Sequence, residues 1–76
     1  MDAKEELQKL GKRIKQLSLE KGLTQSDLAT AINESEEYIS KLEKGAVDID
    51  MIDLFKLARE FQIPICQLFK DQRLIL

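Results

Sequence analysis

The side chains best suited to recognition chemistry occur together between residues 35 and 44. They comprise two hydroxyls, two carboxylates and two ammonium groups, at Ser35, Ser40, Glu36, Glu37, Lys41 and Lys44. A carboxylate or hydroxyl can hydrogen-bond to the edge of a nucleic-acid base, and an ammonium group can pair with a phosphate. These residue types favour binding of a polar partner over a chemical reaction.

Residues required for the common catalytic and metal sites are missing from the sequence. There is no histidine, so neither an ordinary nucleophile–base pair nor an ordinary zinc cluster can be built. The glycines at positions 11, 22 and 45 are too far apart for a phosphate-cradling loop. Cys66 stands among apolar residues and is expected to be a small buried hydrophobe. We expect no enzyme activity, no metal and no cofactor.

The length of 76 residues suits one small domain, spanning 1–76, with a composition that is 43% hydrophobic and 34% charged. A chain this short is marginally stable alone, so a partner subunit would help it. No apolar run approaches the roughly 18 residues of a membrane span, and the first residues do not resemble a signal peptide. We therefore expect a cytoplasmic protein that does not bind membranes.

Apolar spacing and capping residues predict helices and no strand. A first helix carries one apolar stripe and ends near Gly22, the stripe being Leu7, Leu10, Ile14 and Leu17. Thr24 is a good N-cap and Asp27 can complete a capping box, which predicts a second helix from Gln25 to about Ile32. Asn33 tolerates the left-handed conformation that a sharp turn requires.

A third helix is predicted to begin after the cap Ser35 and to stop at Gly45. The second and third helices would form a helix-turn-helix unit, with the apolar residues on its inner side: Leu28, Ala29, Ile32, Ile39 and Leu42. Asp48 or Asp50 can cap a fourth helix. That helix would bury one stripe, Met51, Leu54, Ala58 and Phe61, and carry Ile52 and Phe55 beside it.

Pro64 fits the first turn of a short fifth helix, Ile65 to Phe69, and an apolar tail follows at 70–76. The predicted fold is an all-α, compact five-helix bundle. The apolar surface of the fourth helix is wider than one core face needs. We therefore assign a dimer interface to this helix and to the tail, with Ile52, Phe55, Leu74, Ile75 and Leu76 as its residues.

The charge distribution is uneven. Residues 22–54 hold two basic and eight acidic residues, whereas 1–21 and 55–76 each carry a net charge of +2. The segment predicted to face a partner is therefore the most acidic part of a chain whose net charge is −2. This argues against simple attraction to nucleic acid, because neutralisation of phosphates supplies much of the affinity of such complexes.

With these elements placed, the chain resembles the lambda-repressor-like, Cro/C1-type helix-turn-helix family (XRE family) of bacterial and phage regulators. The resemblance covers 10–69 and is carried by Gly22-Leu23-Thr24-Gln25, Leu28-Ala29, Ile39-Ser40 and Leu42-Glu43-Lys44-Gly45. It implies that Gln25, with Ser26 beside it, contacts a DNA phosphate. It also implies base contacts by Ser35, Glu36 and Glu37, and flanking contacts by Tyr38, Ser40, Lys41 and Lys44.

The largest departure from the family pattern is the acidic pair Glu36-Glu37 at the base-reading positions, and three further positions also differ. Asn33 replaces the usual glycine of the turn, and Glu34 stands where an apolar residue is common, so Glu34 must reach solvent or a partner. Members of the family often pair the glutamate at position 43 with an arginine, but here that position is Ser18. Glu43 therefore needs another donor, either a nearby lysine or the Ser18 hydroxyl, because an unpaired buried carboxylate would cost several kcal/mol.

Two functions of different classes follow from these patterns. The first is a sequence-specific, DNA-binding transcriptional regulator, a repressor or an activator, that acts as a symmetric dimer on a palindromic operator. The acidic readers Glu36 and Glu37 could accept from the cytosine amino group, or could simply favour the helix N-terminus. The alternative is an antirepressor-like protein-interaction module that keeps the helix-turn-helix scaffold without binding DNA.

Overall fold

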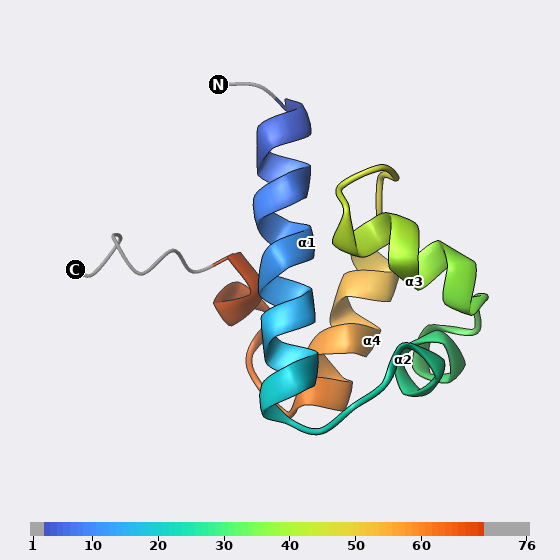
Figure 1. Cartoon of the computed structure of the whole chain (residues 1–76). Coiled ribbons are helices and arrows are strands. Elements are labelled where there is room, and N and C mark those ends of the chain that lie inside the picture. Colours follow the sequence, from blue (N-terminus) through green and yellow to red (C-terminus); the bar gives the residue numbers. More distant parts are fainter. Residues whose placement is uncertain (1–2, 70–76) are drawn as a thin grey trace.

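The computed structural model describes residues 3–69, which form four α-helices and one 3-10 helix and contain no strand (Figure 1). The elements are α1 (Ala3–Glu20), α2 (Gln25–Ile32), α3 (Glu36–Glu43), α4 (Met51–Phe61) and η1 (Ile65–Phe69). Figure 1 shows α2 and α3 on one side of α1 and η1 on the other. No helix within this part of the chain has the length and apolar character that a membrane crossing requires.

Local capping explains where α2 begins and ends. The Thr24 hydroxyl accepts from the Asp27 N–H at 3.1 Å, and the Asp27 carboxylate accepts from the Thr24 N–H at 2.8 Å. This reciprocal pair is the predicted capping box. Asn33 ends the helix with a left-handed φ of 59°, so the predicted turn residue is confirmed.

The remaining helix ends follow the same chemistry. The Ser35 hydroxyl accepts from the Tyr38 N–H at 3.1 Å, which caps α3 as predicted. At α4 the cap is Asp50, the second of the two candidates, whose carboxylate accepts from the Asp53 N–H at 2.8 Å. Gly45 follows α3 with a positive φ of 74°, and Gln62 ends α4 with a φ of 60°.

All five elements contribute to one apolar core. Its fully buried side chains are Ile14, Leu28, Ile39, Leu42, Leu57, Phe61 and Leu68. Two close backbone approaches fix α1 against the end of α3. A Cβ atom at Gly11 would lie 2.5 Å from the Leu42 carbonyl oxygen, and one at Gly45 would lie 2.7 Å from the Gln8 backbone. Side chains at either glycine would therefore push the two helices apart.

Three predictions about helix type and burial differ from the structure. The fifth segment, Ile65–Phe69, is a 3-10 helix and not an α-helix; its Gln67 N–H donates to the Pro64 carbonyl three residues earlier, at 3.0 Å. Cys66 is exposed, because this tight turn buries Leu68 and directs the thiol outward. Met51 is 57% exposed, so the buried stripe of α4 starts with Asp53 and Leu54.

Candidate nucleic-acid interface

The first turn of α3 is held at the surface of the molecule. Ser35, Glu36 and Glu37 are exposed, whereas Ile39 and Leu42 on the opposite side of the helix are buried in the core. Because those two apolar side chains anchor α3 from beneath, the helix presents its amino-terminal turn to solvent. This is the orientation that a helix needs in order to enter a groove of duplex DNA.

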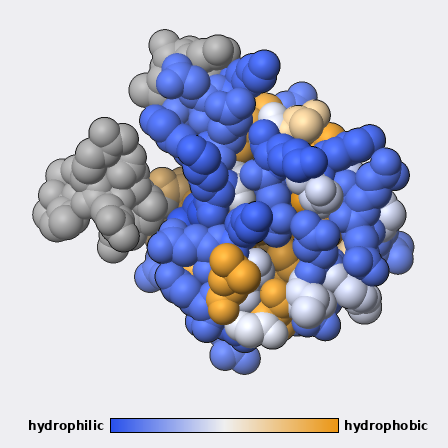
Figure 2. Space-filling view, in the orientation of Figure 1, coloured by the Kyte–Doolittle hydropathy of each residue, from blue (hydrophilic) through white to orange (hydrophobic). Residues whose placement is uncertain are grey.

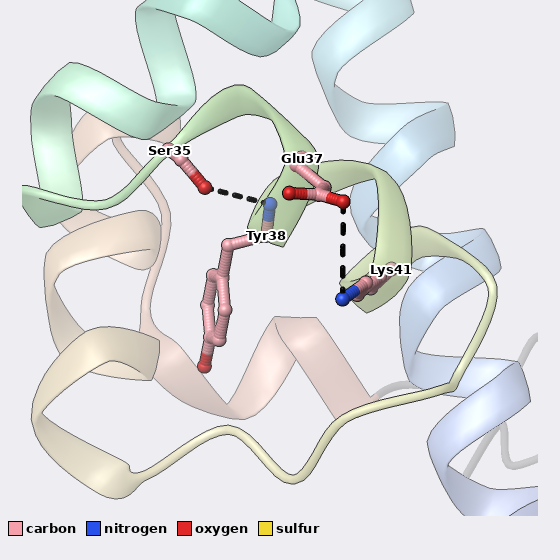
Figure 3. Close-up of polar contacts among 4 residues, drawn as sticks. All are labelled: Ser35, Glu37, Tyr38 and Lys41. Carbon is pink, nitrogen blue, oxygen red and sulfur yellow. Dashed lines mark hydrogen bonds and ion pairs between the residues drawn. The ribbon is translucent and has the colours of Figure 1, made fainter.

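An ion pair joins two of the predicted recognition residues. The Glu37 carboxylate lies 4.0 Å from the Lys41 ammonium group, one helical turn away (Figure 3). The two side chains are 79% and 56% exposed, so water screens the pair and it contributes less than about 1 kcal/mol. Lys41 can therefore exchange this carboxylate for a phosphate at little cost.

Tyr38 takes a different direction from its neighbours. Figure 3 shows its ring extending away from Glu37 and Lys41, and the half-buried side chain packs against the core. Burial raises the pKa of the Tyr38 phenol, and the negative charges of Asp53 and other nearby carboxylates raise it further. The phenol is therefore neutral at physiological pH.

A hydrogen bond connects α2 to the far end of α3. The Gln25 side-chain amide donates from Nε2 to Glu43 Oε1 at 2.9 Å. The expectation that Ser18 or a lysine supplies the donor is corrected here. The Ser18 hydroxyl instead donates to the Lys15 carbonyl at 2.8 Å, which satisfies it within its own helix. Glu43 is only half-buried, which lowers the cost of keeping its charge.

The other predicted contact residues differ in accessibility. Ser26 and Lys44 are exposed, and Ser40 is half-buried. Lys44 is the C-cap of α3, where a cation is favoured by the helix dipole. Glu34 is exposed, so its carboxylate reaches solvent as expected. The face seen in Figure 2 is mostly hydrophilic, with apolar surface confined to small patches.

A second surface feature lies on α4. Ile52 and Phe55 are 65% and 56% exposed, and together with Lys56 and Arg59 they line an open hollow of about 400 Å³. The other predicted interface residues, Leu74, Ile75 and Leu76, lie outside the described residues. Within 3–69, no group of three or more acidic or cysteine side chains is arranged to hold a metal ion.

The structure thus links the start of α2 to the carboxyl end of α3 through Gln25 and Glu43, and the ring of Tyr38 extends away from Glu37 and Lys41. Sequence reasoning missed the pairing of Gln25 with Glu43. The signal that could have found it was the absence of an arginine at position 18, which leaves Glu43 to a different donor.

Comparisons with known proteins agree with this geometry. A family model described as helix-turn-helix matches residues 14–68. The restriction-modification controller protein C.AhdI from Aeromonas hydrophila is 32% identical, with a TM-score of 0.78 over 83% of this chain and 96% of that chain. The clp gene regulator ClgR from C. glutamicum, 24% identical, shares the fold with a TM-score of 0.74 over 80% of this chain and 79% of that one. The search of curated proteins found no match.

Proposed function

Because the chain belongs to the Cro/C1-type helix-turn-helix family of DNA-binding transcription regulators, we propose that it recognises a specific operator through the first turn of α3. One observation carries the proposal: Ser35, Glu36 and Glu37 are exposed on a helix whose opposite side is buried in the core. The major groove, about 12 Å wide, admits a helix presented in this way.

The charges of the interface indicate how recognition would be divided among its residues. Lys41 and Lys44 are exposed and can neutralise phosphates, while Ser26 can hydrogen-bond to one. Glu36 and Glu37 can accept hydrogen bonds from cytosine amino groups, which would give specificity at some cost in affinity. With only two lysines in residues 22–54, a single domain would bind weakly.

We propose that a symmetric dimer compensates for this weakness. Ile52 and Phe55 expose apolar surface on α4, and a second copy would cover it. In the proposed dimer, Leu74, Ile75 and Leu76 contribute to the same interface. Two α3 helices could then enter successive major grooves, about 34 Å apart, on a palindromic site. We further propose that 1–76 acts as one unit in the cytoplasm, where its DNA would be.

The decisive experiment is selection of bound duplexes from a random pool, followed by titration of a recovered duplex at several salt concentrations. A regulator enriches a palindromic consensus, and its affinity falls steeply with salt, because each phosphate contact releases counterions. Failure to retain any duplex at low salt would instead support the protein-interaction module, whose acidic α3 would bind a basic protein surface.

The dimer is tested separately by sedimentation at micromolar concentration. We expect the natural chain to sediment as a dimer and Phe55→Ser to shift it towards monomer, because the substitution removes apolar area from the proposed contact. Cys66→Ser, an exposed change on η1, is the control. A natural chain that is monomeric under these conditions contradicts the proposed interface.

A further inference from the structure

We propose that Glu43 is a positioning residue for DNA binding: it orients the side-chain amide of Gln25 for contact with a backbone phosphate. The proposal rests on the DNA-binding function proposed above. It concerns a residue at the carboxyl end of α3, away from the turn that would read bases.

A hydrogen bond links the two ends of the helix-turn-helix. Gln25 is the first residue of α2 and Glu43 is the last residue of α3, yet Nε2 and Oε1 lie 2.9 Å apart. A glutamine amide has two N–H groups, so one can donate to Glu43 while the other remains for a phosphate oxygen. The carboxylate is charged, which makes it a stronger acceptor than a neutral group would be.

The backbone of Glu43 is packed closely against α1. A Cβ atom at Gly11 would lie 2.6 Å from the Glu43 carbonyl oxygen. An exposed glutamine without a partner samples several rotamers, and ordering it on binding would weaken the complex. Because the bond to Glu43 already restricts Gln25 in the free protein, less conformational entropy is lost when a phosphate binds.

The charge of Glu43 acts in the opposite direction. A carboxylate beside the amide repels the phosphate that the amide would bind. The natural residue therefore combines a favourable orientation with an unfavourable charge. Two neutral substitutions separate these effects: Glu43→Gln keeps an oxygen acceptor for Gln25, whereas Glu43→Ala removes it. Because both variants are neutral at position 43, a difference in their DNA affinity cannot come from the loss of charge.

The experiment is a double-mutant cycle with a mixed-sequence duplex at low salt, because phosphate contacts do not depend on sequence. We expect Glu43→Gln to bind at least as tightly as the natural chain. Glu43→Ala should bind about threefold to tenfold more weakly than Glu43→Gln, the range for one hydrogen bond. In a Gln25→Ala background this difference should vanish. If it is absent in the natural background or persists without Gln25, the proposal is wrong.

A measurement without DNA supports the cycle. The NMR order parameter of the Gln25 side-chain amide should fall in Glu43→Ala and stay unchanged in Glu43→Gln. If the Gln25 amide has the same order parameter in the natural chain, in Glu43→Gln and in Glu43→Ala, then Glu43 does not position Gln25. Because this measurement needs no DNA, it tests the role even where Glu43→Ala is too unstable for binding assays. If the natural chain retains no duplex but the amide is ordered by Glu43, the DNA-binding function fails while the contact itself stands.

Discussion

The close packing of the end of α3 against α1 predicts how much stability is lost when each of two glycines is replaced. Gly22 and Gly45 have nearly the same positive φ, 69° and 74°, but different surroundings. A Cβ atom at Gly22 would meet nothing within 4 Å, whereas one at Gly45 would lie 2.7 Å from the Cα and N atoms of Gln8. Replacing each glycine by alanine therefore separates backbone strain from the close approach of the helices.

The magnitudes follow from these two environments. The left-handed conformation costs alanine about 1–2 kcal/mol, of which about 0.4–1 kcal/mol is offset by the lower entropy of the unfolded chain. Gly22→Ala should therefore destabilise by roughly 1 kcal/mol. Gly45→Ala adds an overlap with backbone atoms, worth about 1–3 kcal/mol more. That sum is a large part of the roughly 4–11 kcal/mol expected for a chain of this size.

The assay is thermal unfolding followed by circular dichroism, with urea unfolding as a second measure. One kcal/mol corresponds to about 4–8 °C in a domain of this size, so the melting temperature should fall by about that amount for Gly22→Ala and at least twice as far for Gly45→Ala. Equal shifts for the two variants would show that α1 does not hold α3 in the way described here.

Three further outcomes are expected. Lys41→Ala should weaken binding to all duplexes and lower the salt slope by about 1, whereas Glu37→Ala should change the preferred sequence; parallel losses from both would contradict the assigned roles. Burial and the charge of Asp50 raise the pKa of Asp53 above 3.8, so the folded state holds that proton more tightly than the unfolded chain. The free energy of unfolding therefore falls as the pH rises through the raised pKa of Asp53. In melting experiments Asp53→Asn should stabilise the protein at pH 7 but not at pH 3, and an equal gain at both pH values would contradict the raised pKa. Gln62→Gly should stabilise by about 0.5 kcal/mol in urea, because glycine relieves the left-handed strain at φ 60°, and a loss of stability would exclude that strain.

Much of the fold follows from interactions between residues close in sequence. Thr24 and Asp27, or Ser35 and the N–H three residues later, meet whenever a helix starts there, so their caps can be predicted without tertiary information. The left-handed turn at Asn33 is equally local. The buried faces of the helix-turn-helix follow from helical periodicity, which explains why the exposed turn of α3 was correctly predicted.

Tertiary packing decided what local chemistry left open. It exposed Cys66 and Met51, directed Tyr38 towards the core, and paired Glu43 with a glutamine 18 residues away. Apolar spacing shows which side chains can be buried, but only the assembled helices determine which surfaces meet. Polar partners distant in sequence are likewise found only when packing brings their atoms within hydrogen-bonding distance. The sequence alone thus determined the four α-helices and the exposure of the α3 turn proposed to bind DNA, and the tertiary structure determined how that turn is held.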